Sequence, residues 1–467
     1  MNELIEGLRQ RLGERVMTDE AVRTAHRRDT WVMGELADLE ERLGDPPLAV
    51  VEPESTAEVA DVLRACRAAR VPVVPYGGGS GVCGGVRTDG REVVLSTRRL
   101  EGLVELDVRD ATARFRAGTN GLAAEQRVQQ DGFTIGHWPQ SIELACVGGL
   151  VATRSAGQYS TGYGNIEDML LALEVVLPDG SVVRTRSTPR ASAGPDLRQL
   201  FLGSEGTLGV ITEAAFSLRP LPEASRGQAF HFPDLSAGLE AIRRCVQTGW
   251  TPPVVRLYDA IESGRQFAEW GGEERAFLLL LHEGPAARVE LELREVAALC
   301  EAAGGVAAGG AAVDDWLERR NHVPGFRTFL EKGIVVDTIE VAATWSRIEA
   351  LYEQTVASLN QVDGILTASA HSSHSYRSGT NLYFTFAARP EDPTRLAETY
   401  RECWRRTMET TLACGGGIAH HHGIGRVRRD FLAAELGEGG VGLLRSVKRA
   451  LDPAGLFNPG VLIPEGE

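Results

Sequence analysis

The spacing of apolar residues changes along the chain and predicts a mixture of helices and strands. Residues 57–70 have apolar side chains at helical spacing, and Ser55 or Thr56 can cap the start of that helix. The apolar run 71–74 is typical of a strand, so the first predicted unit is a helix followed by a strand. The other elements predicted up to residue 185 are strands at 92–96, 103–108, 113–117, 170–177 and 181–185, a turn at 178–180, and a helix at 122–131.

The second half of the chain repeats one order of elements. Strand, helix, strand, strand and helix follow one another after Arg226, and the same order then occurs again. Such an order predicts an antiparallel sheet with helices on one face. The predicted strands are 227–232, 254–258, 276–282, 334–340, 365–370 and 381–386, and the predicted helices are 235–248, 287–303, 345–359 and 393–413. Residues 304–310 are expected to form a flexible loop, and the chain after Gly415 is expected to be rich in loops.

Length and proline positions divide the chain into domains. A chain of 467 residues exceeds the size of one ordinary hydrophobic core, so two domains are expected. Pro220 and Pro222 mark a change of pattern at the end of the first domain. The predicted parts are an N-terminal helical segment at 1–45, a first domain at 46–222, a second domain at 223–415 and a C-terminal segment at 416–467, of which residues 451–464 are expected to return to the first domain.

Composition and charge narrow the class of protein. With 43% hydrophobic and 24% charged residues the chain is predicted to be globular, and its net charge of −15 argues against a nucleic-acid-binding protein. Residues 1–16 lack the apolar segment of a secretory signal, and no apolar run reaches the roughly 20 residues of a membrane span. Seven cysteines without a C-x-x-C pair are typical of reduced thiols. We therefore expect a cytoplasmic protein.

The most distinctive stretch is residues 75–85, PYGGGSGVCGG, which is rich in glycine. A loop with so few side chains can turn its backbone N–H groups toward a phosphate, because no Cβ blocks the approach. It contains the pattern G-x-G-x-x-G, but no helix is predicted directly after it and the Walker lysine is missing. These differences argue against a Rossmann site and against a nucleotide triphosphatase. They favour a pyrophosphate-binding loop between two strands.

This loop resembles the first flavin-binding loop of the vanillyl-alcohol oxidase and p-cresol methylhydroxylase superfamily. Two further segments match that superfamily in the expected order, VGGLVATRSAGQYSTGYGNIEDML at 147–170 and GSEGTLGVIT at 203–212. The resemblance implies an α+β fold, with a two-part FAD-binding domain at 46–222 and a cap domain at 223–415 whose antiparallel sheet is covered by helices. It also implies that FAD is held noncovalently, because Ser80 stands where members with a tethered flavin often have histidine.

The same resemblance implies which residues contact FAD. The glycine loop would bind the dinucleotide through its amides, the glycines of the second segment would let the flavin ring approach, and the third segment would lie near the adenine. Gln140 departs from the superfamily, which usually has Asp at that position. The implied cofactor-binding residues are Pro75, Gly77, Gly78, Gly79, Ser80, Gly81, Pro139, Ser141, Val147, Gly148, Gly149, Ala152, Gly157, Tyr163, Gly164, Glu205, Gly206, Gly209 and Ile211.

A second diagnostic stretch is GIAHHHGIGRVRRDFL at 417–432. His420 and His422 alternate and could bind a metal from a strand, or the histidines could form hydrogen bonds with the backbone. The stretch is similar to the histidine loop of the alkylglycerone-phosphate synthases. Flavin-dependent 2-hydroxy-acid dehydrogenases, the competing relatives, typically show GDGNLH and GEHGIG and hold a divalent metal there. Tyr383 and His421 occupy two ligand positions of that metal site, so no metal is predicted in it. Whether His371 and His374 bind a metal is left open, because their spacing on a strand would point them to opposite faces.

The resemblance to the synthases also implies roles for side chains of the cap. Residues 382–386 alternate, which puts Tyr383 and Thr385 on the face opposite three apolar side chains. Tyr383 would move a proton at the reacting carbon, or it is an ordinary half-buried tyrosine. The other implied catalytic residues, which would stabilise negative charge, are His420, His421, His422 and Arg327. The implied substrate-binding residues are Arg256 and His371, which stands where the eukaryotic synthase has arginine; either arginine named here could instead form a structural ion pair.

Two functions follow from the resemblance. The leading one is that of alkylglycerone-phosphate synthase, an enzyme of ether-lipid synthesis that exchanges the acyl group of acyl-glycerone phosphate for an alkyl group through an adduct at flavin N5. The alternative is an FAD-dependent dehydrogenase or oxidase that takes a hydride from a 2-hydroxy acid or related alcohol, with a histidine as base. A small-molecule or lipid-like substrate is expected in both cases. Peripheral contact with a membrane and a homodimer are both left open.

Overall fold

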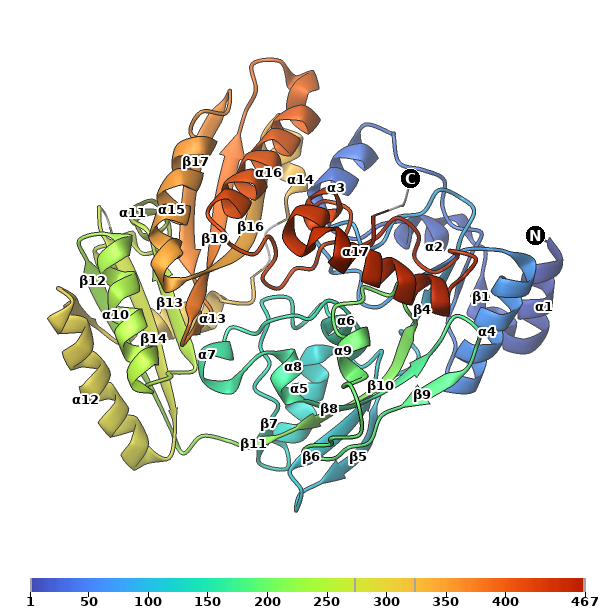
Figure 1. The fold of residues 1–467 in the computed structure, drawn as a ribbon, viewed down its shortest axis with the longest axis horizontal. Coiled ribbons are helices and arrows are strands. Elements are labelled where there is room, and N and C mark those ends of the chain that lie inside the picture. Colours follow the sequence, from blue (N-terminus) through green and yellow to red (C-terminus); the bar gives the residue numbers. More distant parts are fainter. Residues whose placement is uncertain (1, 273, 323–324, 465–467) are drawn as a thin grey trace.

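Four sheets and their covering helices make up the structure, a computed structural model that describes residues 2–272, 274–322 and 325–464 (Figure 1). An eight-stranded sheet forms one side of the molecule in this view, and the smaller sheets lie on the other side. The chain therefore has the two-part arrangement that the sequence predicts, with mixed helices and strands in both parts.

The glycine loop lies between two parallel strands of the first sheet. The strands of this sheet, in spatial order, are β1 (Val16–Met17), β2 (Ala49–Val51), β4 (Val93–Ser96) and β3 (Val73–Tyr76). Helix α4 (Thr56–Ala69) joins β2 to β3, and the Ser55 hydroxyl caps it by accepting a hydrogen bond from the Glu58 N–H. The predicted order of helix, strand and glycine loop is confirmed, and within the described chain β4 is the element that follows the loop.

The second sheet is antiparallel and carries the hairpin predicted around residues 178–180. Its strands, in spatial order, are β5 (Leu103–Asp107), β6 (Thr112–Arg116), β10 (Val210–Ser217), β8 (Leu170–Val176) and β9 (Val182–Arg184). The turn joins β8 to β9, and Val176 lies opposite Val182. Apolar side chains such as Phe115 and Phe216 pack in one core with helices α5 (Gly121–Gln129) and α6 (Val147–Ala152).

The eight-stranded sheet is antiparallel and has its longest covering helices on one face. In spatial order its strands are β15 (Val306–Gly309), β12 (Ala224–Phe232), β14 (Ala276–Gly284), β13 (Val254–Tyr258), β17 (Ile365–Ser372), β19 (Gly379–Ala388) and β16 (Val335–Thr344), and β18 (Ser375–Tyr376) pairs with β19. Four long helices pack in its main core, as Figure 1 shows: α10 (Leu235–Thr248), α12 (Ala286–Ala302), α15 (Trp345–Leu359) and α16 (Leu396–Ala413). The predicted cap sheet is therefore confirmed.

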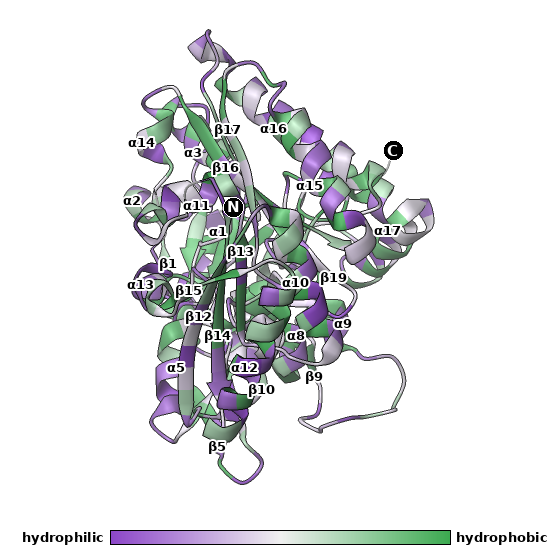
Figure 2. Ribbon diagram, turned by 90° about the vertical axis from the view of Figure 1, so that its left-hand side faces the viewer, coloured by the Kyte–Doolittle hydropathy of each residue, from purple (hydrophilic) through white to green (hydrophobic). Residues whose placement is uncertain are grey.

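Strand β19 separates the two faces of this sheet. Leu382, Phe384 and Phe386 are fully buried in the core under the helices, whereas Tyr383 and Thr385 line a cavity on the opposite face. Helix α13 (Ala311–Arg319) also packs on that opposite face, against β12 and β14. In Figure 2 the long strands are mainly green, whereas the helices change between green and purple, as elements with one buried and one exposed side do.

Two predictions about the later part of the chain are wrong. Helix α17 (Leu432–Leu451), which is interrupted by a kink at Gly437 with a φ of +70°, occupies most of the stretch expected to be rich in loops. Its glycines weaken the local helical signal, and the packing of buried Val441 supplies the stabilisation that propensity does not. The stretch expected to be a flexible loop contains β15, because its small residues pair with the backbone of β12. In both cases tertiary contacts override local propensity.

The last described residues run back beside the first sheet. Phe457 lies next to Val73, and the Asn458 N–H donates to the Val73 carbonyl at 2.8 Å. None of the helices in the described ranges is long and apolar enough to cross a membrane. The remaining elements are α1 (Asn2–Leu12), α2 (Glu20–Ala25), α3 (Val32–Leu39), α7 (Ser160–Tyr163), α8 (Ile166–Met169), α9 (Arg198–Phe201), α11 (Ala260–Gln266), α14 (Arg327–Leu330), β7 (Phe133–Thr134), β11 (Arg219–Pro220) and the 3-10 turns η1 (Gly13–Arg15), η2 (Ala268–Trp270), η3 (Pro393–Arg395) and η4 (Arg429–Phe431).

Candidate active site

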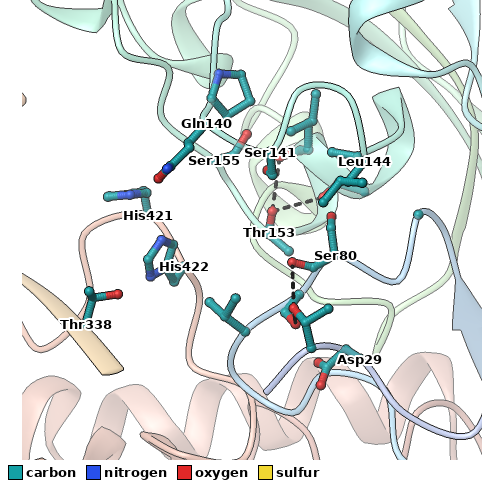
Figure 3. A pocket seen from close by; sticks show the side chains of 18 of the residues that line it. Asp29, Ser80, Gln140, Ser141, Leu144, Thr153, Ser155, Thr338, His421 and His422 are labelled. Atoms are coloured by element: carbon teal, nitrogen blue, oxygen red, sulfur yellow. Dashed lines mark hydrogen bonds between the residues drawn. The ribbon is translucent and has the colours of Figure 1, made fainter. Parts of the chain in front are cut away.

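A cavity of about 1070 Å³ lies between the glycine loop and the cap sheet. Residues within 75–82, 139–156 and 205–211 line it from one part of the chain, and residues of β13, β16, β17 and β19 line it from the other. Figure 3 shows His421, His422 and Thr338 across the pocket from Ser80 and Thr153. The two halves of the chain therefore share one site.

The glycine loop is shaped for close approach of a ligand to its backbone. A Cβ on Gly78 would lie 2.0 Å from the carbonyl oxygen of Leu144, and Gly79 has a φ of +68°. Within the described chain, the backbone N–H groups of Gly79, Ser80 and Gly81 donate to no protein acceptor. Unpaired N–H groups beside a cavity are what a bound diphosphate requires.

Tyr383 is the centre of a series of polar contacts on the cap side of the cavity. Its hydroxyl lies 3.1 Å from Thr338 Oγ1 and 3.4 Å from His422 Nε2. The other ring nitrogen of His422, Nδ1, lies 2.8 Å from the Glu340 carboxylate. Because a carboxylate accepts, Nδ1 carries the proton and Nε2 is left to accept one from Tyr383. Burial raises the pKa of Tyr383, so its phenol is protonated at neutral pH.

Glu340 is a fully buried carboxylate on β16 that positions the histidine loop. It accepts hydrogen bonds from the His422 backbone N–H at 2.8 Å and from Arg428 Nη2 at 2.5 Å. Burial by itself would raise its pKa, but the charge of Arg428 and the hydrogen bond from His422 hold the pKa of Glu340 well below its usual value. Arg428 is also completely buried, so Glu340 and Arg428 neutralise each other away from water.

A second buried carboxylate positions His371. Glu262 of α11 lies 2.8 Å from His371 Nδ1, and Arg256 Nη2 lies 3.0 Å from His371 Nε2. Arginine can only donate, so Nε2 accepts and Nδ1 carries the single ring proton of a neutral imidazole. Burial lowers the pKa of His371, which agrees with that form. The imidazole stacks on the ring of Tyr383 at a centroid distance of 4.8 Å, so Arg256, His371 and Tyr383 form one continuous surface.

Three more imidazoles gather at the end of the cap sheet. One ring nitrogen from each of His374, His420 and His421 lies within 4.8 Å of the others. Hydrogen bonds account for this cluster. His374 Nδ1 lies 2.5 Å from Ser160 Oγ, and His420 contacts the Tyr376 hydroxyl at 2.7 Å and His421 Nδ1 at 2.8 Å. Burial lowers the pKa of His420 to about 4 and also lowers those of His374 and His421, so the three rings are neutral at pH 7.

Two family models match the chain. The FAD binding domain model matches residues 47–186, and the model of the C-terminal domain of FAD linked oxidases matches residues 221–462. The chain belongs to the FAD-linked oxidase family. FAD is therefore its cofactor, and the predicted fold class of a two-part FAD-binding domain with a cap is confirmed.

This FAD-linked oxidase is similar in sequence to an oxidoreductase and to alkyldihydroxyacetonephosphate synthases, and similar in fold to a methylhydroxylase. An FAD-linked oxidoreductase of Escherichia coli (strain K12), YgcU, is 33% identical over 99% of this chain and 98% of its own length. The alkyldihydroxyacetonephosphate synthase of Trypanosoma brucei brucei is 30% identical over 90% of this chain and 73% of its own length. A solved structure of an alkyldihydroxyacetonephosphate synthase covers 98% of this chain and 84% of its own, with 25% identity and a TM-score of 0.81. Substrate-bound p-cresol methylhydroxylase shares the fold at a TM-score of 0.79 and 16% identity, over 98% of this chain and 96% of its own.

The cavity of this FAD-linked oxidase fits the cofactor at the positions where the glycine loop leaves N–H groups free. Most residues implied to bind FAD surround the same cavity. They are Pro75, Gly77, Gly78, Gly79, Ser80, Gly81, Pro139, Ser141, Gly148, Gly149, Ala152, Glu205, Gly206, Gly209 and Ile211. Gln140, the departure from the superfamily, also lines it and donates through Nε2 to the His322 carbonyl.

Five implied site residues do not line this cavity, and their implied roles stay predictions. Val147 is buried in the core of the second sheet, and Gly157 is needed because a Cβ there would lie 2.6 Å from the backbone nitrogen of Trp138. The Tyr163 hydroxyl donates to Glu283 at 2.7 Å, and Gly164 ends α7 with a φ of +89°. His420 makes the hydrogen bonds described above.

Arg327 is implied to stabilise charge during the reaction, and the structure gives it a different environment. Its guanidinium contacts Glu35 at 3.0 Å, Asp38 at 3.4 Å and Glu331 at 3.3 Å, and its side chain is 48% exposed. Although Arg327 lies at the edge of the cavity, its charge is already neutralised by carboxylates. The structural ion pair named as an alternative is therefore present, and the implied catalytic role of Arg327 stays a prediction.

Sequence reasoning missed three charged residues of this site. Glu340, Glu262 and Arg320 line the cavity or bond to side chains that do. Glu340 stands within an apolar strand, and a carboxylate in such a run could have signalled a buried partner. Glu262 and Arg320 belong to helices α11 and α13 or their ends, which the apolar spacing did not predict.

Proposed function

We propose that this FAD-linked oxidase, with FAD bound noncovalently, catalyses the exchange reaction of the alkyldihydroxyacetonephosphate synthases. The acyl group of an acyl-glycerone phosphate would be replaced by an alkyl group. The contacts from Tyr383 to His422 and from His422 to Glu340 give the main support, because they form a path for a proton beside the cavity. Noncovalent binding is supported by Ser80, whose hydroxyl stands where a tethering histidine would be needed.

Side chains of the cap would move one proton to and from the substrate. FAD, when bound, would supply the reactive flavin ring. Tyr383 would pass its hydroxyl proton to His422 Nε2 and take a proton from the reacting carbon. Glu340 would stabilise the resulting imidazolium, and Arg428 would keep Glu340 ionised and in place. The N–H groups of the neutral His421 imidazole and its neighbours would donate to the departing carboxylate.

The test is an exchange assay on a variant of Tyr383. We expect Tyr383→Phe to bind FAD as wild type does and to lose at least about 100-fold in turnover of acyl-glycerone phosphate with a radiolabelled long-chain alcohol. The loss follows because the phenyl ring keeps the stacking on His371 and lacks the proton. Tyr352→Phe is the matched control, since its hydroxyl contacts Asp259 at 3.1 Å away from the cavity. Full activity of Tyr383→Phe would remove this residue from the mechanism.

A second candidate is an FAD-dependent oxidoreductase that acts on a 2-hydroxy acid or related alcohol. The arrangement of His371 favours it, because a carboxylate that takes over the N–H groups of Arg256 would leave His371 Nε2 to accept a hydroxyl proton. To test this candidate, D-lactate and glycolate are added to the anaerobic holoenzyme and the visible flavin spectrum is recorded. If either acid bleaches the flavin, the proposed exchange reaction is rejected in favour of this oxidoreductase function. Exchange activity without bleaching would retain the synthase proposal.

A further inference from the structure

Two arginines beside the cavity have no carboxylate partner. In the described ranges, no Asp or Glu oxygen lies within 4.0 Å of the guanidinium of Arg256 or of Arg320, although both line the cavity. Nearby arginines behave differently, since Arg319 contacts Asp315 at 2.9 Å and Arg265 contacts Glu262 at 3.5 Å. A shielded cation without a counterion is costly, so these two positions need a further explanation.

Aromatic rings and neutral groups hold the two guanidinium groups in place. Both lie over the indole of Trp316, with the Arg256 Cζ at 5.4 Å and the Arg320 Cζ at 5.7 Å from its centroid. Arg256 donates to the Tyr258 hydroxyl at 2.7 Å, and Arg320 Nη1 donates to Gln158 Oε1 at 3.2 Å. Stacking on a ring fixes the plane of a guanidinium and leaves its edge free to donate. Most of the N–H groups of Arg320 thus remain available.

The electrostatics of the pair favour an anion. Burial lowers the pKa of Arg320 and the nearby charge of Arg256 lowers it further, whereas Tyr159 and the more distant Glu283 act in the opposite direction. An oxyanion placed between them would offset both effects and could accept charge-assisted hydrogen bonds from two sides. A neutral ligand would offset neither. The oxygens of a planar carboxylate or of a tetrahedral phosphate monoester can both accept hydrogen bonds from such a pair.

We propose that Arg256 and Arg320 form the binding site for the acidic group of the substrate, a carboxylate or a phosphate monoester. This assignment rests on the proposed function of the cavity. Arg256 touches His371, whose ring stacks on Tyr383, so an anion at this pair would be held one ring away from the proton-transfer group. The acidic group would then orient the reacting carbon toward the Tyr383 hydroxyl. Arg320 acts here as a specificity-determining residue.

The test measures binding to the FAD-loaded enzyme without turnover, by flavin difference spectra and calorimetry. The probes are glycolate, glycerol 3-phosphate and neutral glycerol. We expect the tighter-binding anion to lose about 10- to 100-fold in affinity in Arg320→Ala and in Arg256→Ala, and Arg320→Lys to recover part of the loss. Arg319→Ala is the matched control, because it removes the same charge from the next residue, which already has a carboxylate partner. The better of the two anions shows whether the site takes carboxylate or phosphate.

Several results would overturn the assignment. The first is that Arg256→Ala and Arg320→Ala bind the anion as tightly as Arg319→Ala does. The second is that glycerol binds as tightly as the anions. The third is that the wild-type enzyme binds none of the probes. Unchanged FAD content in each variant excludes misfolding as the cause of a loss. The proposed function can fail separately: anion binding that depends on Arg256 and Arg320, without exchange or flavin bleaching, would keep this site and reject the reaction. Exchange activity in the wild-type enzyme, together with unaltered anion binding in the variants, would keep the reaction and reject this site.

Discussion

At the scale of single residues, the buried carboxyl groups fall into two classes. Glu340 and Glu262 are paired with cationic or histidine side chains, which hold their pKa values below the ordinary value despite burial. Burial instead raises the pKa values of Asp29, Asp259 and Asp337 to about 6. The folded state therefore keeps protons on this second class that the unfolded chain loses between about pH 4 and 6. The free energy of unfolding should fall as the pH rises through that window.

Asp337 gives a direct test of this linkage. It accepts hydrogen bonds from the neutral donors Tyr400 and Trp404, so Asn can replace it without leaving a buried charge unpaired. We expect Asp337→Asn to lose this pH dependence, so that its stability relative to wild type rises by up to about 3 kcal/mol between pH 4 and pH 7. Chemical denaturation of the apoprotein at four pH values measures the difference. Asp363→Asn, at an exposed position, should follow the wild-type profile, and an Asp337→Asn profile parallel to wild type would contradict the account.

At the scale of elements, the glycine loop owes its shape to the backbone that faces it. Gly78 lies so close to the Leu144 carbonyl that any side chain must displace one of the two backbone segments. Gly85 belongs to the same loop and also borders the cavity, but the nearest atom to a Cβ there is Asp29 Oδ2 at 3.8 Å. Replacing each of these two glycines by alanine therefore distinguishes the effect of the close backbone approach from the effect of losing a glycine.

We expect Gly78→Ala to weaken FAD binding by at least about 10-fold, because the shifted loop no longer presents its N–H groups to the diphosphate. Gly85→Ala should bind FAD nearly as wild type does. Titration of apoprotein with FAD, followed by quenching of flavin fluorescence, measures both affinities. An FAD affinity of Gly78→Ala equal to that of Gly85→Ala would show that the cradle does not depend on this close approach.

The spacing of apolar residues predicts a helix or strand well where the signal lies within the element itself. Helices α10 and α15 begin and end at the predicted residues, because their apolar spacing matches one buried face. The glycine and histidine loops are found for the same reason, since each is contiguous in sequence. Glu340, Glu262 and Arg320 reach the site from three separate elements and belong to no motif, so only the fold brings them together. Helix α17 shows the converse, because its glycines hide an element that packing stabilises.

At the scale of the whole molecule, the C-terminal segment connects both halves around the cavity. The His422 N–H donates to Glu340 of the cap sheet, whereas the Ile424 and Gly425 N–H groups donate to Glu205 beside the glycine loop. The segment then continues through α17 to Phe457, which is buried in the core of the first sheet. The position of the histidine loop over the cavity therefore depends on an anchor about 35 residues further along the chain.

Phe457 is the residue at which this anchor can be weakened. Phe457→Ala removes a ring that is 2% exposed, and we expect it to lower the free energy of unfolding by about 3 to 5 kcal/mol through lost burial and a cavity. Because the histidine loop is held through the same segment, FAD release should also begin at a lower temperature. Leu443→Ala is the control, since Leu443 lies on α17 with 66% exposure and its truncation should change stability by no more than about 0.5 kcal/mol. Thermal unfolding followed by flavin fluorescence and circular dichroism compares the two. Equal melting and equal FAD release would mean that the two halves hold together without this anchor.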